Sequence, residues 1–138
     1  MSGERNLQQL LMHMEPVQQP GSYVFVTIPS LDNDYASASV MTFREAEGYT
    51  LILEKSMADR EGLVYGFVAA WITLTVHSAL DAVGLTAAFS GALANAGISC
   101  NVVAGYYHDH IFVPESSAGK AMAVLQSLRQ ATGNGHTA

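Results

Sequence analysis

The chain has 138 residues, of which 49% are hydrophobic and 13% are charged. This composition is typical of a globular protein, and the length allows one compact domain or two very small ones that share a core. Twelve acidic and six basic residues give a formal net charge of -6. Because the basic residues are few and scattered, no surface suits a phosphate backbone or an anionic bilayer. We therefore expect neither nucleic acid nor a membrane as a partner.

The cysteine content and the N-terminus predict a cytoplasmic protein. Cys100 is the only cysteine, so it cannot form an internal disulfide, and we expect a small buried apolar side chain there. The N-terminus lacks the charged and apolar regions of a signal peptide. The longest apolar stretch, residues 63–76, is shorter than the ~20 residues of a membrane-spanning helix, and we interpret it as one or two buried strands.

The first half of the chain begins with a predicted helix and strand. Residues 6–14 place four apolar side chains on one face, which predicts a short helix that ends before Pro16. Residues 23–29 are rich in β-branched and aromatic side chains and predict a strand ended by Pro29. The polar segment 30–37 is expected to be a loop.

A hairpin is predicted next. Two apolar runs, residues 38–43 and 49–53, surround a charged turn that contains Gly48. Residues 56–62 suit a short helix or turn, and residues 63–70 supply a further strand. We therefore expect the first half to lack a helix between its first two strands.

The second half is more regular. Residues 72–76 alternate apolar and polar side chains, which predicts a strand with one buried face, and residues 77–84 form a polar loop. Residues 85–96 repeat apolar side chains at helical spacing, and Gly97 is a stop signal. Residues 98–104 and 111–113 predict two strands joined by a polar turn, and residues 115–129 predict a final helix.

The resulting βαββα order predicts an α+β fold, with an antiparallel sheet and helices packed on one face. We expect two ferredoxin-like subdomains derived from a βαββαβ pattern, covering residues 1–70 and 71–131. Residues 132–138 are expected to be a disordered tail. Each half looks incomplete alone, so we expect the N-terminal helix or strand, or a second chain, to complete the C-terminal subdomain.

The segment from Trp71 to Pro114, and more weakly the opening residues 6–29, resembles an ACT domain. The chain is similar to a small bacterial family with two ACT-like units in tandem, related in fold to the ACT repeats of amino-acid sensors. The resemblance implies a regulatory protein that binds a small molecule, an amino acid, without being an enzyme and without a cofactor. Low surface charge and apolar segments favour a homo-oligomer, expected to be a dimer.

The loop at residues 77–84 is the predicted ligand site. It joins a strand end to a helix start, where unsatisfied backbone N–H groups and the helix dipole favour a carboxylate. The resemblance assigns ligand contacts to four residues from Val83 to Thr86, flanked by Ser78 and Asp81. Gly84 could equally serve only a tight turn, and Asp81 or Thr86 only a helix cap. The implied ligand contacts are Ser78, Asp81, Val83, Gly84, Leu85, Thr86 and Asp109.

The turn from Tyr106 to His110 has two possible roles. On an extended strand His108 and His110 would share a face, and two imidazoles plus a carboxylate could ligate zinc, although a third or fourth ligand would be needed from elsewhere. The resemblance instead implies that Asp109 pairs with a cationic group of the ligand. An aspartate that only stabilises its own turn is the third reading. A structural or dimerisation module without a ligand also remains open, and no nucleophile motif indicates catalysis.

Overall fold

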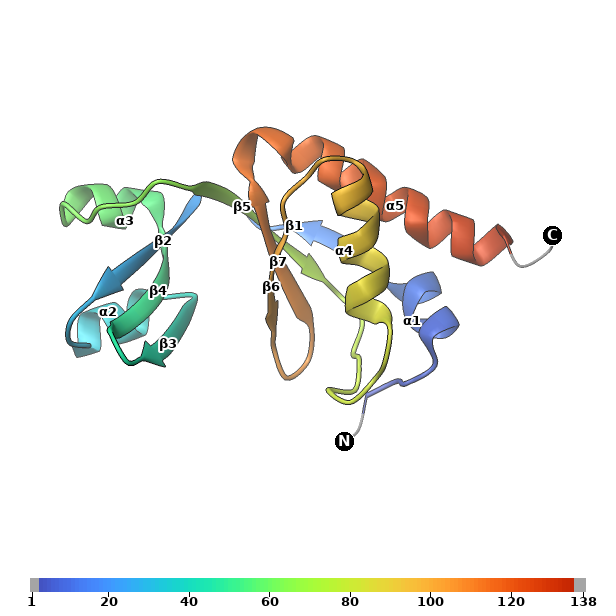
Figure 1. Ribbon diagram of the computed structural model, residues 1–138, viewed down its shortest axis with the longest axis horizontal. Helices are drawn as coiled ribbons and strands as arrows, with labels where there is room; N and C mark the ends of the chain where they lie inside the picture. Colours follow the sequence, from blue (N-terminus) through green and yellow to red (C-terminus); the bar gives the residue numbers. More distant parts are fainter. Residues whose placement is uncertain (1–2, 136–138) are drawn as a thin grey trace. The chain divides into compact units, whose positions relative to one another are not determined.

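The computed structural model describes residues 3–135, which form two compact units (Figure 1). One unit contains the described residues up to Gln19 together with those from Trp71 onward, and the other contains Pro20–Ala70. The helices are α1 (Leu7–His13), α2 (Asn33–Ala38), α3 (Lys55–Arg60), α4 (Leu85–Asn95) and α5 (Ala118–Gly135). The strands are β1 (Pro16–Gln18), β2 (Tyr23–Ile28), β3 (Met41–Glu45), β4 (Gly48–Glu54), β5 (Val68–Leu74), β6 (Asn101–Ala104) and β7 (Asp109–Pro114). We call the two parts the β1 unit and the β2 unit.

The β2 unit is a complete ferredoxin-like βαββαβ unit. Its strands lie in the order β3-β4-β2-β5, and β2 pairs with β4 along its whole length, from Tyr23 opposite Glu54 to Ile28 opposite Tyr49. The first residues of β5 supply the last strand, with Val68 opposite Val24. The apolar side chains of β2 and β4 form the core together with Ala58 of α3.

The β1 unit is also complete, because the N-terminal strand supplies its last member. The strands lie in the order β1-β5-β7-β6, and β1 pairs antiparallel with β5 from Pro16 opposite Leu74 to Gln18 opposite Ile72. Helices α1, α4 and α5 pack on one another, and α5 also packs on β1 and β7 (Figure 1). The predicted α+β fold of two ferredoxin-like units with antiparallel sheets is confirmed.

Helix α4 forms where the sequence predicts it, and its ends are well defined. It begins after Gly84, whose φ of 101° is accessible to glycine at little cost. Leu85, Phe89 and Leu93 recur at helical spacing and are buried. At the other end Gly97 has a φ of 77°, and the N–H of Ile98 donates to the Leu93 carbonyl oxygen at 2.9 Å, which completes a Schellman motif.

Three sequence predictions about elements are wrong. The segment 30–37, expected to be a loop, contains most of helix α2, because the Asp32 side chain accepts from the N–H of Tyr35 and caps it. The stretch 63–76, interpreted as one or two strands, contains a single strand, β5, which starts at Val68 and not at residue 63 as expected. The predicted disordered tail is helical up to Gly135, where α5 ends, and residues 136–138 lie outside the described residues.

The break between the units after Ala70 coincides with the boundary expected between residues 1–70 and 71–131, but the N-terminal residues group differently from that expectation. Residues 3–19 group with the C-terminal part of the chain, since α1 packs on α5 and β1 pairs with β5. Of the alternatives offered by the sequence, the N-terminal helix and strand are therefore what completes the C-terminal unit. Among the described residues, no helix has the length and apolar character needed to cross a membrane.

Candidate functional site

The loop between β5 and α4 meets the turn between β6 and β7 in the β1 unit, and the two enclose a small cavity of about 80 Å³. We call it the loop pocket. From the loop and the first turn of α4 come Ser78, Ala79, Leu80, Ala82, Leu85 and Thr86, and from the hairpin come Ala104, Gly105, His108 and Asp109. This volume is below the ~300 Å³ of small ligand sites, so it suits the head group of a ligand and not a large molecule.

Two side chains of the loop pocket carry polar groups that burial disfavours. Burial raises the pKa of the Asp109 carboxyl, against a weaker opposing effect of His108. Asp109 takes part in none of the salt bridges formed by the described residues. The Nδ1 atom of His108 is buried and has no hydrogen-bond partner within the described part of the chain. Because an unpaired buried polar atom costs free energy, the Nδ1 atom of His108 favours a ligand that forms a hydrogen bond with it, and the Asp109 carboxylate favours a ligand that donates hydrogen bonds.

The first turn of α4 adds hydrogen-bond donors to the same wall. In an α-helix the first N–H groups have no partner within the helix. Gly84 stands at the N-cap and has no side chain that could accept from them. Leu85 and Thr86, the first two helical residues, line the loop pocket. The wall therefore combines backbone donors at a positive helix end with a carboxyl from the hairpin, and these are complementary to a carboxylate and an ammonium group.

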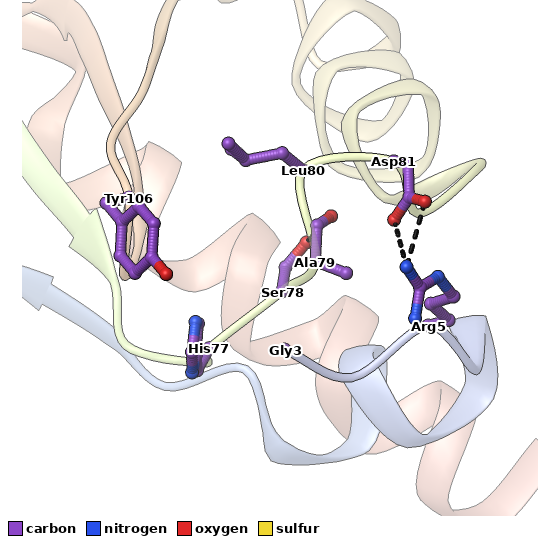
Figure 2. A pocket seen from close by; sticks show the side chains of 8 residues that line it. All are labelled: Gly3, Arg5, His77, Ser78, Ala79, Leu80, Asp81 and Tyr106. Atoms are coloured by element: carbon purple, nitrogen blue, oxygen red, sulfur yellow. Dashed lines mark hydrogen bonds and ion pairs between the residues drawn. The ribbon is translucent and has the colours of Figure 1, made fainter. Parts of the chain in front are cut away.

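A second, larger cavity of about 300 Å³ shares Ser78, Ala79 and Leu80 of the loop with the loop pocket (Figure 2). We call it the N-terminal pocket; it is lined by Gly3, Arg5, His77, Ser78, Ala79, Leu80, Asp81 and Tyr106. Nη2 of Arg5 lies 2.8 Å from each carboxylate oxygen of Asp81. The hydrogen bond from Arg5 lowers the pKa of Asp81, and the same bond raises the pKa of Arg5. Figure 2 shows this ion pair across the pocket from the Tyr106 ring.

Five of the seven residues predicted to contact a ligand line one or both pockets. Ser78, Leu85, Thr86 and Asp109 line the loop pocket, although they come from segments far apart in the sequence. Ser78 and Asp81 line the N-terminal pocket. Val83 is 83% exposed, and Gly84 faces Leu7, so neither residue lines a pocket described here. No local pattern in the sequence points to Arg5, which reaches the site only because the N-terminal segment returns to the C-terminal unit.

The histidines of the turn do not form a metal site with other ligands. His110 lies on β7, where its Nδ1 atom accepts from Nε1 of Trp71 at 3.1 Å and contacts the Thr73 hydroxyl at 3.1 Å. Burial lowers the pKa of His110, and the charge of His108 lowers it further. Within residues 3–135, no group of three or more His, Cys, Asp and Glu side chains is placed to hold a metal ion. The structure therefore gives the zinc hypothesis no support.

Cys100 is half-buried beside β6. Burial raises the pKa of its thiol to about 11. The thiolate is therefore scarce at neutral pH, which makes a nucleophilic role unfavourable.

Family models cover nearly the whole chain. A model described as ACT domain matches residues 2–70, and a second with the same description matches residues 67–127. The chain belongs to the ACT domain family. Its two ACT domains stand in tandem, and such domains are regulatory units that bind small molecules. No curated protein sequence matches this ACT protein.

Solved structures similar to this ACT protein share its two-unit fold. A Vibrio cholerae protein of unknown function, described as a possible transport protein, is 49% identical, with a TM-score of 0.81 over 89% of this chain and 95% of that one. An Agrobacterium tumefaciens protein is 17% identical, with a TM-score of 0.64 over 85% of this chain and 90% of that one. The regulatory subunit of aspartate kinase from Thermus thermophilus is 10% identical, with a TM-score of 0.62 over 85% and 97%. At this identity the last two show similarity of fold alone.

Proposed function

We propose that this ACT protein is a regulatory sensor, not an enzyme, and that it binds an amino acid in the loop pocket of the β1 unit. One observation carries the proposal. The loop pocket is lined by Asp109, by His108, whose Nδ1 atom has no partner among the described residues, and by the first turn of α4. Asp109 and His108 accept from the ammonium group, and the amides of α4 donate to the carboxylate. The similarity to an aspartate kinase regulatory subunit is consistent with such a role.

The small volume of the loop pocket sets what it can select. A cavity of about 80 Å³ accommodates the head group and leaves the ligand side chain at the pocket mouth. The pocket then binds both the ammonium group and the carboxylate of an amino acid, which lie at a fixed separation. A simple amine or a simple carboxylate has only one of these groups and binds more weakly. Occupancy acts on a partner by favouring one arrangement of the ACT units over another, since a ligand shifts an equilibrium by its difference in affinity.

Thermal unfolding in the presence of each of the twenty common amino acids tests the proposal. A ligand at ten times its Kd stabilises the native state by ~1.4 kcal/mol. For a protein of this size that corresponds to an increase in Tm of ~5 °C. We expect at least one amino acid to give such an increase, and its N-acetyl and amide derivatives, which each lack one charge, to give none. If no amino acid changes Tm at millimolar concentration, the chain is a structural module instead.

Two variants locate the binding site. Asp109→Asn removes the carboxylate that accepts from the ammonium group, so the amino-acid response should disappear. Asp34→Asn changes an exposed aspartate in α2 of the other unit and serves as the matched control. A response that survives in Asp109→Asn would place the ligand elsewhere.

We further propose that the chain is a homodimer, since ACT domains oligomerise as a class. The support in this chain is β3, which pairs only with β4 in the described sheet and presents Phe43 at 62% exposure. An open strand edge with an exposed aromatic side chain favours association. Sedimentation velocity should give twice the monomer mass, and Phe43→Glu should reduce it to that of the monomer. A wild-type monomer at micromolar concentration would contradict the dimer.

A further inference from the structure

The N-terminal segment, residues 3–7, runs beside the loop that carries the proposed site. The N–H of Glu4 donates to the His77 carbonyl oxygen at 2.9 Å, and the N–H of Ala79 donates to the Glu4 carbonyl oxygen at 3.0 Å. Glu4 and Ser78 thereby form a parallel bridge outside the named strands. The loop before α4 thus has a backbone partner that belongs to neither the hairpin nor the helix.

Side-chain contacts extend this pairing in both directions. A Cβ atom on Gly3 would lie 2.6 Å from the backbone nitrogen of Ala79, so only glycine allows the two backbones to approach this closely. Two residues further on, Arg5 holds Asp81 with both carboxylate oxygens at 2.8 Å. Beyond it the Leu7 side chain covers Gly84, where an added Cβ would lie 3.0 Å from Leu7 Cδ2. Four successive contacts therefore follow the loop from its start to the N-cap of α4.

The other end of the segment is fixed to the core of the β1 unit. Asn6 caps α1 by accepting from the N–H of Gln9, and α1 packs against α5 and α4. Nε of Arg129 on α5 donates to the Met12 carbonyl oxygen at 3.1 Å, and its guanidinium forms an ion pair with Glu15. The segment is therefore anchored at α1, and the residues that contact the loop are those just before α1 together with Leu7, its first residue.

We propose that residues 3–7 are a latch that holds the 77–84 loop in the conformation that forms the loop pocket, and so regulate ligand binding there. The regulatory part rests on the proposed function. One wall of the loop pocket is formed by Ser78, Ala79 and Leu80. The same three residues line the N-terminal pocket beside the latch. When the latch releases, this wall loses its support. By reciprocity, a ligand that needs the wall stabilises the latched form.

Hydrogen–deuterium exchange of the ligand-free protein tests the latch directly. The Arg5–Asp81 pair is exposed, with side-chain exposures of 58% and 70%. Its loss should therefore have a modest effect, and we expect Arg5→Gln to accelerate exchange of the 77–84 amides by ~2- to 5-fold. Combining Arg5→Asp with Asp81→Arg should restore the wild-type rate. Lys55→Gln, which breaks the Lys55–Asp59 pair of the other unit, is the matched control and should leave the loop unchanged.

Gly3→Ala gives a second variant with a larger expected effect, because it separates the two backbones and breaks both hydrogen bonds of Glu4. Exchange of the 77–84 amides should rise more in Gly3→Ala than in Arg5→Gln, while exchange in the β2 unit stays constant. Unchanged loop exchange in both variants would overturn the latch.

The regulatory part has its own measurement. In the thermal unfolding panel of the twenty amino acids, Gly3→Ala should reduce the Tm increase that the wild type shows. An equal increase in both proteins would overturn regulation by the latch even if exchange shows that the latch exists. If the wild type responds to no amino acid, the proposed function and the regulatory part fail together, and exchange alone decides whether the latch holds the loop.

Discussion

At the scale of single residues, two polar groups that are unfavourable for stability lie together at the proposed site. Asp109 is a half-buried carboxyl, and His108 has a buried Nδ1 atom that no described group satisfies. Groups of this kind lower stability unless a ligand compensates for them. Their presence in one cavity is therefore better explained by binding than by folding.

Asp109→Asn tests this explanation through stability. Burial raises the pKa of Asp109 in the native state, so between its unfolded value near 3.8 and the raised value the native protein binds more protons than the unfolded one. Stability contributed by the protonated acid is then lost as pH rises through that window. An asparagine cannot ionise, so the variant should have a slightly higher free energy of unfolding than the wild type at neutral pH. Urea denaturation measures this difference, and a less stable variant would show that Asp109 has a structural role.

His110 gives a pH dependence of opposite sign. Its Nδ1 atom accepts from Trp71, and protonation of that atom would break the bond. Burial lowers the native pKa below the unfolded value of about 6.5, so the unfolded protein binds more protons in the window between the two. The stability contributed by neutral His110 is present above about pH 6.5 and is lost as pH falls through that window.

Urea denaturation at about pH 7.5 and pH 5 measures this effect, with Trp71, the only tryptophan, as the fluorescent probe. The wild type should lose more stability on acidification than His110→Gln. His13→Gln, which changes an exposed histidine on α1, should behave as the wild type. Equal losses in the wild type and in His110→Gln would contradict the assignment.

Some single-residue roles could be predicted from the sequence and others could not. Ser78, Leu85 and Thr86 belong to a strand-to-helix loop that the local pattern reveals, and the family resemblance added Asp109; the structure places all four in one cavity. Their contact with a ligand stays a prediction. Arg5 was missed because its position depends on the return of the N-terminus to β5, which no local pattern encodes.

At the scale of elements, α4 is what brings the site's donors into place. Phe89 and Leu93 are fully buried on the face of α4 turned away from solvent. Phe89→Ala removes a large core side chain and leaves a cavity, so it should lower the free energy of unfolding by ~3–5 kcal/mol. Asn95→Ala, at an exposed position of the same helix, should change it by less than ~0.5 kcal/mol. Denaturant unfolding checks both, and a small effect of Phe89→Ala would show that α4 contributes little to the core.

The elements predicted correctly are those with a strong local signal. Helix α4 has apolar positions at helical spacing, β2 is rich in β-branched and aromatic residues, and the hairpin of β3 and β4 has two apolar runs around a turn. Helix α2 was missed because it buries no residue and depends on the Asp32 cap. Strand β1 was missed because three residues carry no period, and only pairing with β5 defines it.

At the scale of the whole molecule, β5 explains why the two observed units divide between Ala70 and Trp71, where the sequence also predicts a boundary. Val68 and Ala69 close the β2 unit by pairing with β2, whereas Ile72 to Leu74 open the β1 unit by pairing with β1. The two family models overlap at residues 67–70, where this strand starts. A sequence boundary marks where one ACT domain ends along the chain, but it cannot show that residues 3–19 supply the missing strand of the other.

The central claim is that an amino acid binds between the α4 N-terminus and the turn of β6 and β7. The most direct measurement is an NMR titration of the uniformly 15N-labelled protein with the twenty common amino acids, added singly. We predict that at least one of them shifts the amide signals of residues 78–86 and 104–109 in a saturable way, while signals of the β2 unit core stay in place. Saturable shifts confined to other residues, or none with any amino acid, would contradict the account.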